Sequence, residues 1–177
     1  MERFIGKRML VPKSKLIEDL PSEEAVIELD YLIARFIGAF KLRHMRFGLI
    51  LFIFNALDIQ GINLLLNPWS QAAVYTRDRV GFVVAGETRI VFQAMSKLTV
   101  GPETAERYSV SNHVLQARVA QGGIFYTLVR WFSSMPHMSD RFVELVRFVR
   151  RNNATISFLE SDQKFYADFI RAFEIAG

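Results

Sequence analysis

The chain has 177 residues, of which 51% are hydrophobic and 23% charged, with 22 lysines and arginines against 18 aspartates and glutamates. This length and apolar content suit one globular domain and exclude intrinsic disorder and low-complexity scaffolds. The absence of cysteine excludes a disulfide framework, a thiolate metal site and a cysteine nucleophile. No apolar run of signal-peptide length follows the first basic residues, so we expect no signal peptide and a cytoplasmic protein or a component of an assembled particle.

Residues 1–20 are expected to form an extended N-terminal arm, because basic and apolar residues alternate there and Pro12 interrupts any regular pattern. The arm has too few periodic apolar positions to fold alone, so we expect it to contact another subunit. The residues expected at this interface are Phe4, Lys7, Arg8, Lys13 and Lys15.

A helix is predicted to begin at Ser22, where a capping hydroxyl precedes two glutamates that favour the helix dipole. Apolar residues then recur at helical spacing as far as Phe40. The next segment, residues 47–66, starts with the most apolar run of the chain, and its periodicity leaves both a buried strand and a helix open. A membrane span is disfavoured because Asp58 would lie near its middle.

The middle of the chain is interpreted as a turn followed by β-structure. Asn67-Pro68-Trp69-Ser70 is typical of a turn, and the runs that follow are rich in β-branched and aromatic residues. Two antiparallel hairpins are predicted, one joining residues 79–85 to 88–94 through Gly86-Glu87 and one joining residues 114–119 to 124–131 through residues 121–123. The first half of the second hairpin is alternatively a helix that starts near Pro102.

The last quarter of the chain contains two predicted helices. Ser139 is expected to cap a helix over residues 139–151, and residues 155–159 suit a short strand. A final helix opens at Ser161-Asp162 and carries aromatic residues on two adjacent faces, which favours one face packed on its own domain and one against a neighbour. The interface residues expected on this helix are Phe165, Phe169 and Phe173.

Together these elements predict an α+β fold. Residues 21–177 form a single domain in which one or two antiparallel β-hairpins pack against the N-terminal helix and the two C-terminal helices. No internal repeat and no linker rich in proline, glycine or serine divides it.

Few residues suggest a chemistry. The histidines, His44, His113 and His137, have no metal-ligand spacing, and no phosphate-binding loop is present, so we expect no metal and no cofactor. Arg147, Arg150 and Arg151 form a basic helix end that is a candidate anion site, although cations there also complement the helix dipole.

Asp58 is a candidate acid or base if residues 47–66 are helical, because it would then share a face with apolar residues. The competing interpretation is that Asp58 only caps a local turn.

The function predicted from these patterns is that of a non-enzymatic structural subunit of a large assembly, such as a ring or connector of a phage-tail-like or virus-like particle. Its expected partners are other protein subunits, in a homo- or hetero-oligomer. The first alternative is a basic protein associated with nucleic acid, and the second is a small enzyme that uses Asp58. A membrane partner is not expected.

Overall fold

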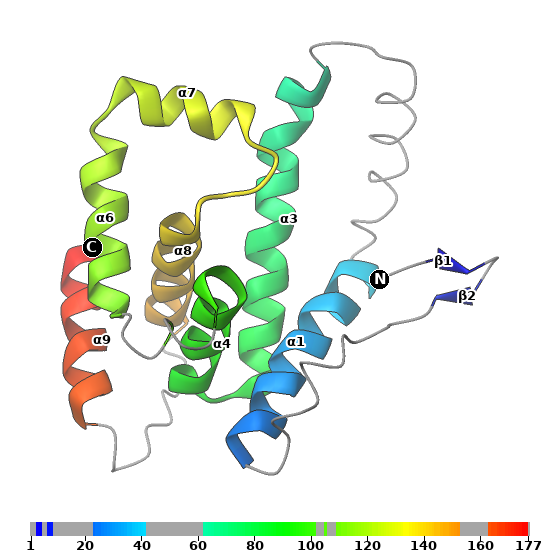
Figure 1. Cartoon of the computed structure of the whole chain (residues 1–177), viewed down its shortest axis with the longest axis vertical. Coiled ribbons are helices and arrows are strands. Elements are labelled where there is room, and N and C mark those ends of the chain that lie inside the picture. The colour runs from blue at the N-terminus through cyan, green and yellow to red at the C-terminus, as the bar shows by residue number, and fades with distance from the viewer. Residues whose placement is uncertain are drawn as a thin grey trace.

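The computed structural model describes residues 3–4, 7–8, 23–41, 62–101, 105, 109–152 and 163–176. Within these ranges the chain is a bundle of seven helices (Figure 1). They are α1 (Glu23–Lys41), α3 (Ile62–Ala85), α4 (Thr88–Val100), α6 (Val110–Gln121), α7 (Ile124–Phe132), α8 (Met138–Arg151) and α9 (Gln163–Ala176). The predicted α+β fold is therefore wrong.

The β-structure among the described residues is one short antiparallel pair at the N-terminus. Strand β1 (Arg3–Phe4) pairs with β2 (Lys7–Arg8), so that Arg3 lies opposite Arg8 and Phe4 opposite Lys7. The pair lies within the predicted arm. The remaining residues of the arm, including Lys13 and Lys15, lie outside the described residues, as do residues 47–61 and the predicted strand at 155–159.

The predicted first hairpin is the junction of two helices. Residues 79–85 end α3, and residues 88–94 begin α4. Gly86 adopts a positive φ of 72° and donates its N–H to the carbonyl of Phe82, which is how a glycine ends a helix. The sequence predicts a hairpin turn at Gly86-Glu87, but the chain connects two helices there, because Asp78 and Phe82 recur at helical spacing on one buried face of α3.

The predicted second hairpin and the predicted turn before the first are also helical. Residues 114–119 lie in α6, residues 124–131 lie in α7, and Gly122-Gly123 connects the two helices. Asn67-Pro68-Trp69-Ser70 lies inside α3. Residues 62–66 are helical as well, which resolves that end of the ambiguous segment.

The helices predicted near the two ends of the chain are confirmed with small changes at their starts. Helix α1 begins at Glu23, and α9 begins at Gln163. Helix α8 begins at Met138, and the residue at its N-cap is His137 rather than Ser139. The His137 Nδ1 accepts the Ser139 N–H at 3.4 Å.

Helix α8 lies at the centre of the bundle and packs against α3, α6 and α9. Its buried face carries Phe142, Leu145, Val146 and Val149 at helical spacing. The Phe92 ring of α4 packs on Phe142 with a centroid separation of 5.2 Å. Helix α1 packs against the lower part of α3 at one side of the molecule, whereas α6 and α9 lie side by side at the other (Figure 1).

Helix α7 differs from the others because it lies across one end of the bundle. It runs from the end of α6 towards α3, at the top of the view in Figure 1. None of its nine residues is buried. Helix α7 is therefore a strongly apolar helix in an exposed position, and its sequence fits its environment less well than that of the other described helices.

Candidate interaction surface

Helix α7 has its apolar side facing outwards. Its apolar residues expose between 49% and 84% of their surface, and they are Ile124, Phe125, Leu128, Val129, Trp131 and Phe132. At about 100° per residue these six positions fall within an arc of about 160° on one side of the helix. We call these six residues the α7 face.

Of the three polar residues on the other side of α7, Tyr126 is partly buried against the bundle, whereas Thr127 and Arg130 are exposed. Tyr126 donates a hydrogen bond from its hydroxyl to the buried carboxylate of Asp140 in α8. Gln121, at the end of α6, donates to the other oxygen of the same carboxylate at 3.4 Å. A surface helix normally buries its apolar side. Helix α7 instead exposes its apolar side and is anchored through Tyr126 on the opposite side, and we call this orientation inverted.

Two buried amides of α3 hold the carboxyl end of α7. The Gln71 Nε2 donates to the carbonyls of Arg130 and Ser133 at 2.6 and 2.7 Å, and the Asn67 Nδ2 donates to the carbonyl of Trp131 at 2.9 Å. The last carbonyls of a helix have no partner within the helix, so these amides satisfy groups that are otherwise left to water. Specific side chains therefore fix the inverted orientation.

Tyr75 of α3 lies close to Asp140 of α8 and to Arg130 of α7. Burial, together with the charge of Asp140, raises the pKa of Tyr75 to about 12, although the Arg130 guanidinium opposes this rise. Burial and the hydrogen bond to Asp140 likewise raise the pKa of Tyr126. Both phenols therefore stay protonated at neutral pH, and Tyr126 remains a donor to Asp140.

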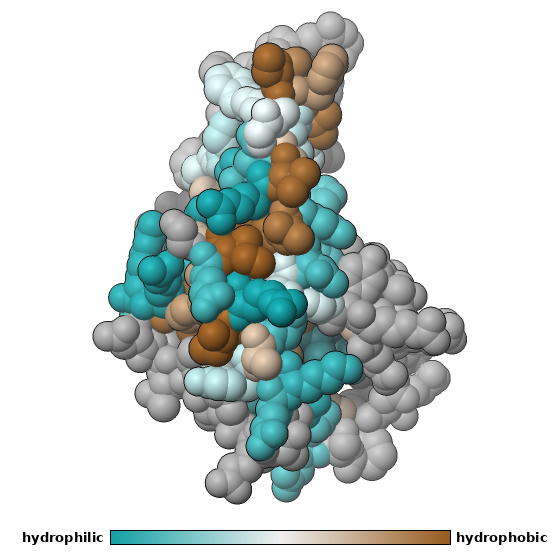
Figure 2. Space-filling model, turned by 90° about the vertical axis from the view of Figure 1, so that its left-hand side faces the viewer, coloured by the Kyte–Doolittle hydropathy of each residue, from teal (hydrophilic) through white to brown (hydrophobic). Residues whose placement is uncertain are grey.

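The apolar surface continues from α7 onto α6. Leu115 and Val119 are both exposed on α6, one helical turn apart. Figure 2 shows hydrophobic residues gathered over the upper half of this side of the molecule, where Figure 1 places α6 and the start of α7. Monomeric proteins rarely expose contiguous apolar patches above a few hundred Å².

The residues that the sequence predicts at an interface lie outside the α7 face. On α9, Phe169 is fully buried against Phe92 at a centroid distance of 5.4 Å, and Phe165 and Phe173 are half-buried beside it. Phe4, Lys7 and Arg8 belong to the short strand pair. The structure therefore does not bring the α9 aromatics together with the α7 face.

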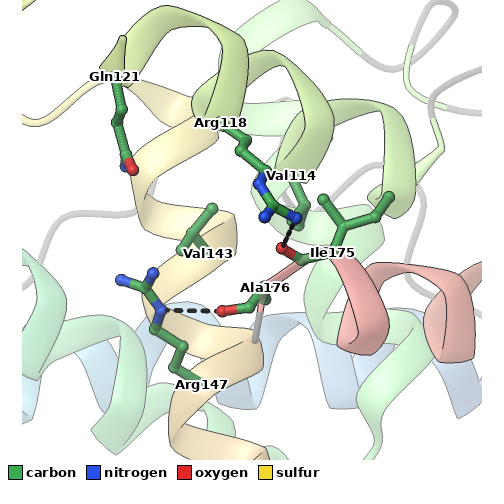
Figure 3. Close-up of a pocket in the computed structure, with 7 residues that line it drawn as sticks. All are labelled: Val114, Arg118, Gln121, Val143, Arg147, Ile175 and Ala176. Atoms are coloured by element: carbon green, nitrogen blue, oxygen red, sulfur yellow. Dashed lines mark hydrogen bonds between the residues drawn. The ribbon is translucent and has the colours of Figure 1, made fainter.

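The arginines expected to bind an anion are divided between two environments. Arg147 lines a pocket of about 160 Å³ between α6, α8 and α9, where it donates to the carbonyl of Ala176 at 3.3 Å (Figure 3). Arg118 donates to the carbonyl of Ile175 from the opposite side at 3.2 Å. Arg150 and Arg151 are exposed outside this pocket. The two pocket arginines thus cap the end of α9.

The most buried carboxylate is engaged by cations. Asp78, 2% exposed, pairs with the Arg35 Nε at 2.8 Å and with two nitrogens of Arg141 at 2.7 and 2.9 Å. The Tyr31 hydroxyl lies 3.4 Å away. Burial disfavours the charge of Arg141, but Asp78 more than offsets this effect and raises the Arg141 pKa. Asp58, the carboxylate selected from the sequence, lies outside the described residues.

Among the described residues, no group of three or more histidines and acidic residues is placed to hold a metal ion. None of the described helices is long and apolar enough to cross a bilayer. No family model, curated protein or solved structure matches the chain.

Proposed function

We propose that this chain is a non-enzymatic structural subunit of a protein assembly and that the α7 face is the surface through which it joins its neighbours. The inverted orientation of α7 carries this proposal. Six apolar side chains face outwards while buried polar groups of α3 and α8 hold the helix in that orientation. Interfaces are enriched in such aromatic side chains at their centres.

The composition of the α7 face supports binding by burial of apolar surface rather than by charge. Three of its six members are aromatic, and an aromatic side chain presents 150–250 Å². The exposed part of Phe125, Trp131 and Phe132 alone amounts to roughly 400 Å². This is about half of the 800 Å² that each partner contributes to a standard interface. That the assembly is a ring or connector of a phage-tail-like or virus-like particle stays a prediction.

The interactions of the buried carboxylates favour this proposal over an enzyme. Asp78 is held by Arg35 and Arg141, and Asp140 accepts hydrogen bonds from Tyr126 and Gln121. These carboxylates therefore join helices to one another, which is a structural role.

The test is the native size of the chain in an extract of its own source, measured by gel filtration with detection by antibody. Wild-type chain should elute in a complex of at least twice its own 20.4 kDa. Val129→Glu, which places a charge on the α7 face, should elute near the size of the single chain. Gln163→Glu, an equal charge change at an exposed site of α9, should remain in the complex. Elution of the wild-type chain as a monomer would overturn the proposal.

A further inference from the structure

We infer that the occupant of the α7 face is a second copy of this chain, bound so that the two α7 helices pack against each other across a two-fold axis. The inference rests on the proposed function and names the partner at that surface. It follows from the charge, the size and the placement of the α7 face.

The charge of the surface permits its pairing with itself. In a two-fold interface the same patch occurs on both subunits, so any charge at its centre meets a like charge. The α7 face carries no charged residue, and the single charged residue of α7 is Arg130, which lies on its polar side. Self-association of this face therefore brings no like charges together at the centre.

The size of the surface matches the needs of a stable dimer. The aromatic members supply roughly 400 Å². Ile124, Leu128 and Val129 on α7, with Leu115 and Val119 on α6, add exposed aliphatic surface beside them. The total approaches the 800 Å² per partner of a standard interface. A second copy presents an apolar area of equal extent, so neither side leaves a large apolar surface in water.

The placement of α7 across the end of the bundle makes the face accessible to another copy (Figure 1). Leu128 is the middle residue of the helix, Ile124–Phe132. If the two helices are antiparallel and cross at Leu128, Trp131 of one copy lies beside Phe125 of the other. Aromatic pairs of this kind add about 0.5–1.5 kcal/mol beyond the area that they bury.

A lipid surface suits α7 less well. Helices that lie in a membrane interface present lysines and arginines to the headgroups on their polar side. The polar side of α7 is instead held against the bundle through Tyr126, and its one cation is Arg130.

The experiment uses introduced cysteines, which give an unambiguous signal because the native chain has none. Leu128→Cys should form a disulfide-linked dimer on mild oxidation, since a residue at the two-fold axis meets its own copy. Lys164→Cys, exposed on α9 away from α7, is the matched control and should stay a single chain on a non-reducing gel.

Light scattering of the purified full chain gives the second measurement. The wild-type chain should reach a dimer mass with rising concentration, and Val129→Glu should weaken this association at least tenfold. Because Val129 is exposed, the variant should keep the helical circular dichroism and melting temperature of the wild type. Gln163→Glu should dimerise as the wild type does.

One result overturns the inference without touching the proposed function. In that result the purified wild type is a monomer and Leu128→Cys does not cross-link, yet Val129→Glu is still lost from the native complex in the extract. The occupant of the α7 face is then a different protein. If the monomeric chain instead sediments with vesicles of neutral and anionic phospholipid, the occupant is a lipid surface, and the proposed function fails together with the inference. If Val129→Glu keeps the dimer mass, the dimer interface is centred elsewhere and the inference fails.

Discussion

At the scale of single residues, Asp78 is a buried carboxylate whose charge is balanced by two arginines. It is buried between Arg35 and Arg141, so its removal leaves two guanidinium groups without their counter-charge. Breaking a buried pair by removing one partner costs about 3–5 kcal/mol. We expect Asp78→Asn to lower the free energy of unfolding by that amount in urea denaturation. Glu24→Gln, which removes the exposed partner of Arg89, should cost less than about 1 kcal/mol; equal losses would contradict this interpretation.

Gly81 shows a second effect of a single residue, because a larger side chain has no room there. A Cβ at this position of α3 would lie 2.6 Å from the Tyr31 ring and from the Arg35 Cγ, both on α1. Alanine is the better helix former, but overpacking costs about 1–3 kcal/mol. We therefore expect Gly81→Ala to lower the melting temperature. At Gly122 the nearest atom to such a Cβ is 3.6 Å away, so Gly122→Ala should not.

The sequence indicates some of these residues and misses others for a physical reason. Asp58 is a candidate in the sequence because a helix over residues 47–66 would place it on one face with apolar residues, whereas Asp78 stands between two arginines in the sequence. The signal for Asp78 was its spacing, four residues after Val74 and four before Phe82, both of which are buried. Its ion partners are 43 and 63 residues away, and spacing along one helix cannot indicate them.

At the scale of elements, α7 shows how β-propensity misleads. Its β-branched and aromatic residues were interpreted as a strand, but its apolar positions recur one, four, five, seven and eight residues after Ile124. This pattern is helical, and it was present in the sequence. The outward direction of the apolar side depends on Asn67, Gln71 and Asp140, which lie in other helices. The sequence of α7 alone therefore does not predict which way its apolar side faces. The helices α1, α8 and α9 were predictable because their apolar periodicity and their core coincide.

The anchoring of α7 can be tested separately from its binding. Gln71→Leu removes the donor to two carbonyls at the end of α7, and an unsatisfied buried acceptor costs about 1–3 kcal/mol. We expect the amides of α7 to exchange with deuterium faster in this variant, while those of α8 remain protected. Thr76→Val removes a bond within α3 itself and should leave α7 unchanged. Uniform acceleration throughout the bundle would instead mean that Gln71 stabilises the whole fold.

At the scale of the whole molecule, two titratable groups join parts of the chain that are far apart in sequence. Asp168 of α9 accepts hydrogen bonds at the start of α6, from the Ser109 hydroxyl at 2.6 Å, from the Val110 N–H at 2.7 Å and from Ser111. Burial alone would raise the Asp168 pKa, but these bonds outweigh it and hold the pKa below the ordinary value of an aspartate. His113 of α6 stacks on Phe142 of α8 with a centroid separation of 4.3 Å. Burial, with a smaller effect of His137, lowers the pKa of His113 below the ordinary value of a histidine.

These two shifts predict how stability depends on pH, because both folded-state pKa values lie below the unfolded-state values. In each case the unfolded chain binds the proton more readily, so stability is lost as the pH falls. The contribution of His113 to the free energy of unfolding is complete above about pH 6.5 and declines below that pH. The contribution of Asp168 is complete above about pH 4 and is lost as the pH falls further. The urea midpoint should therefore decrease in two stages from pH 7 to pH 3. His113→Gln should remove the first stage and Asp168→Asn the second, and a first stage that persists in His113→Gln would assign it to another group.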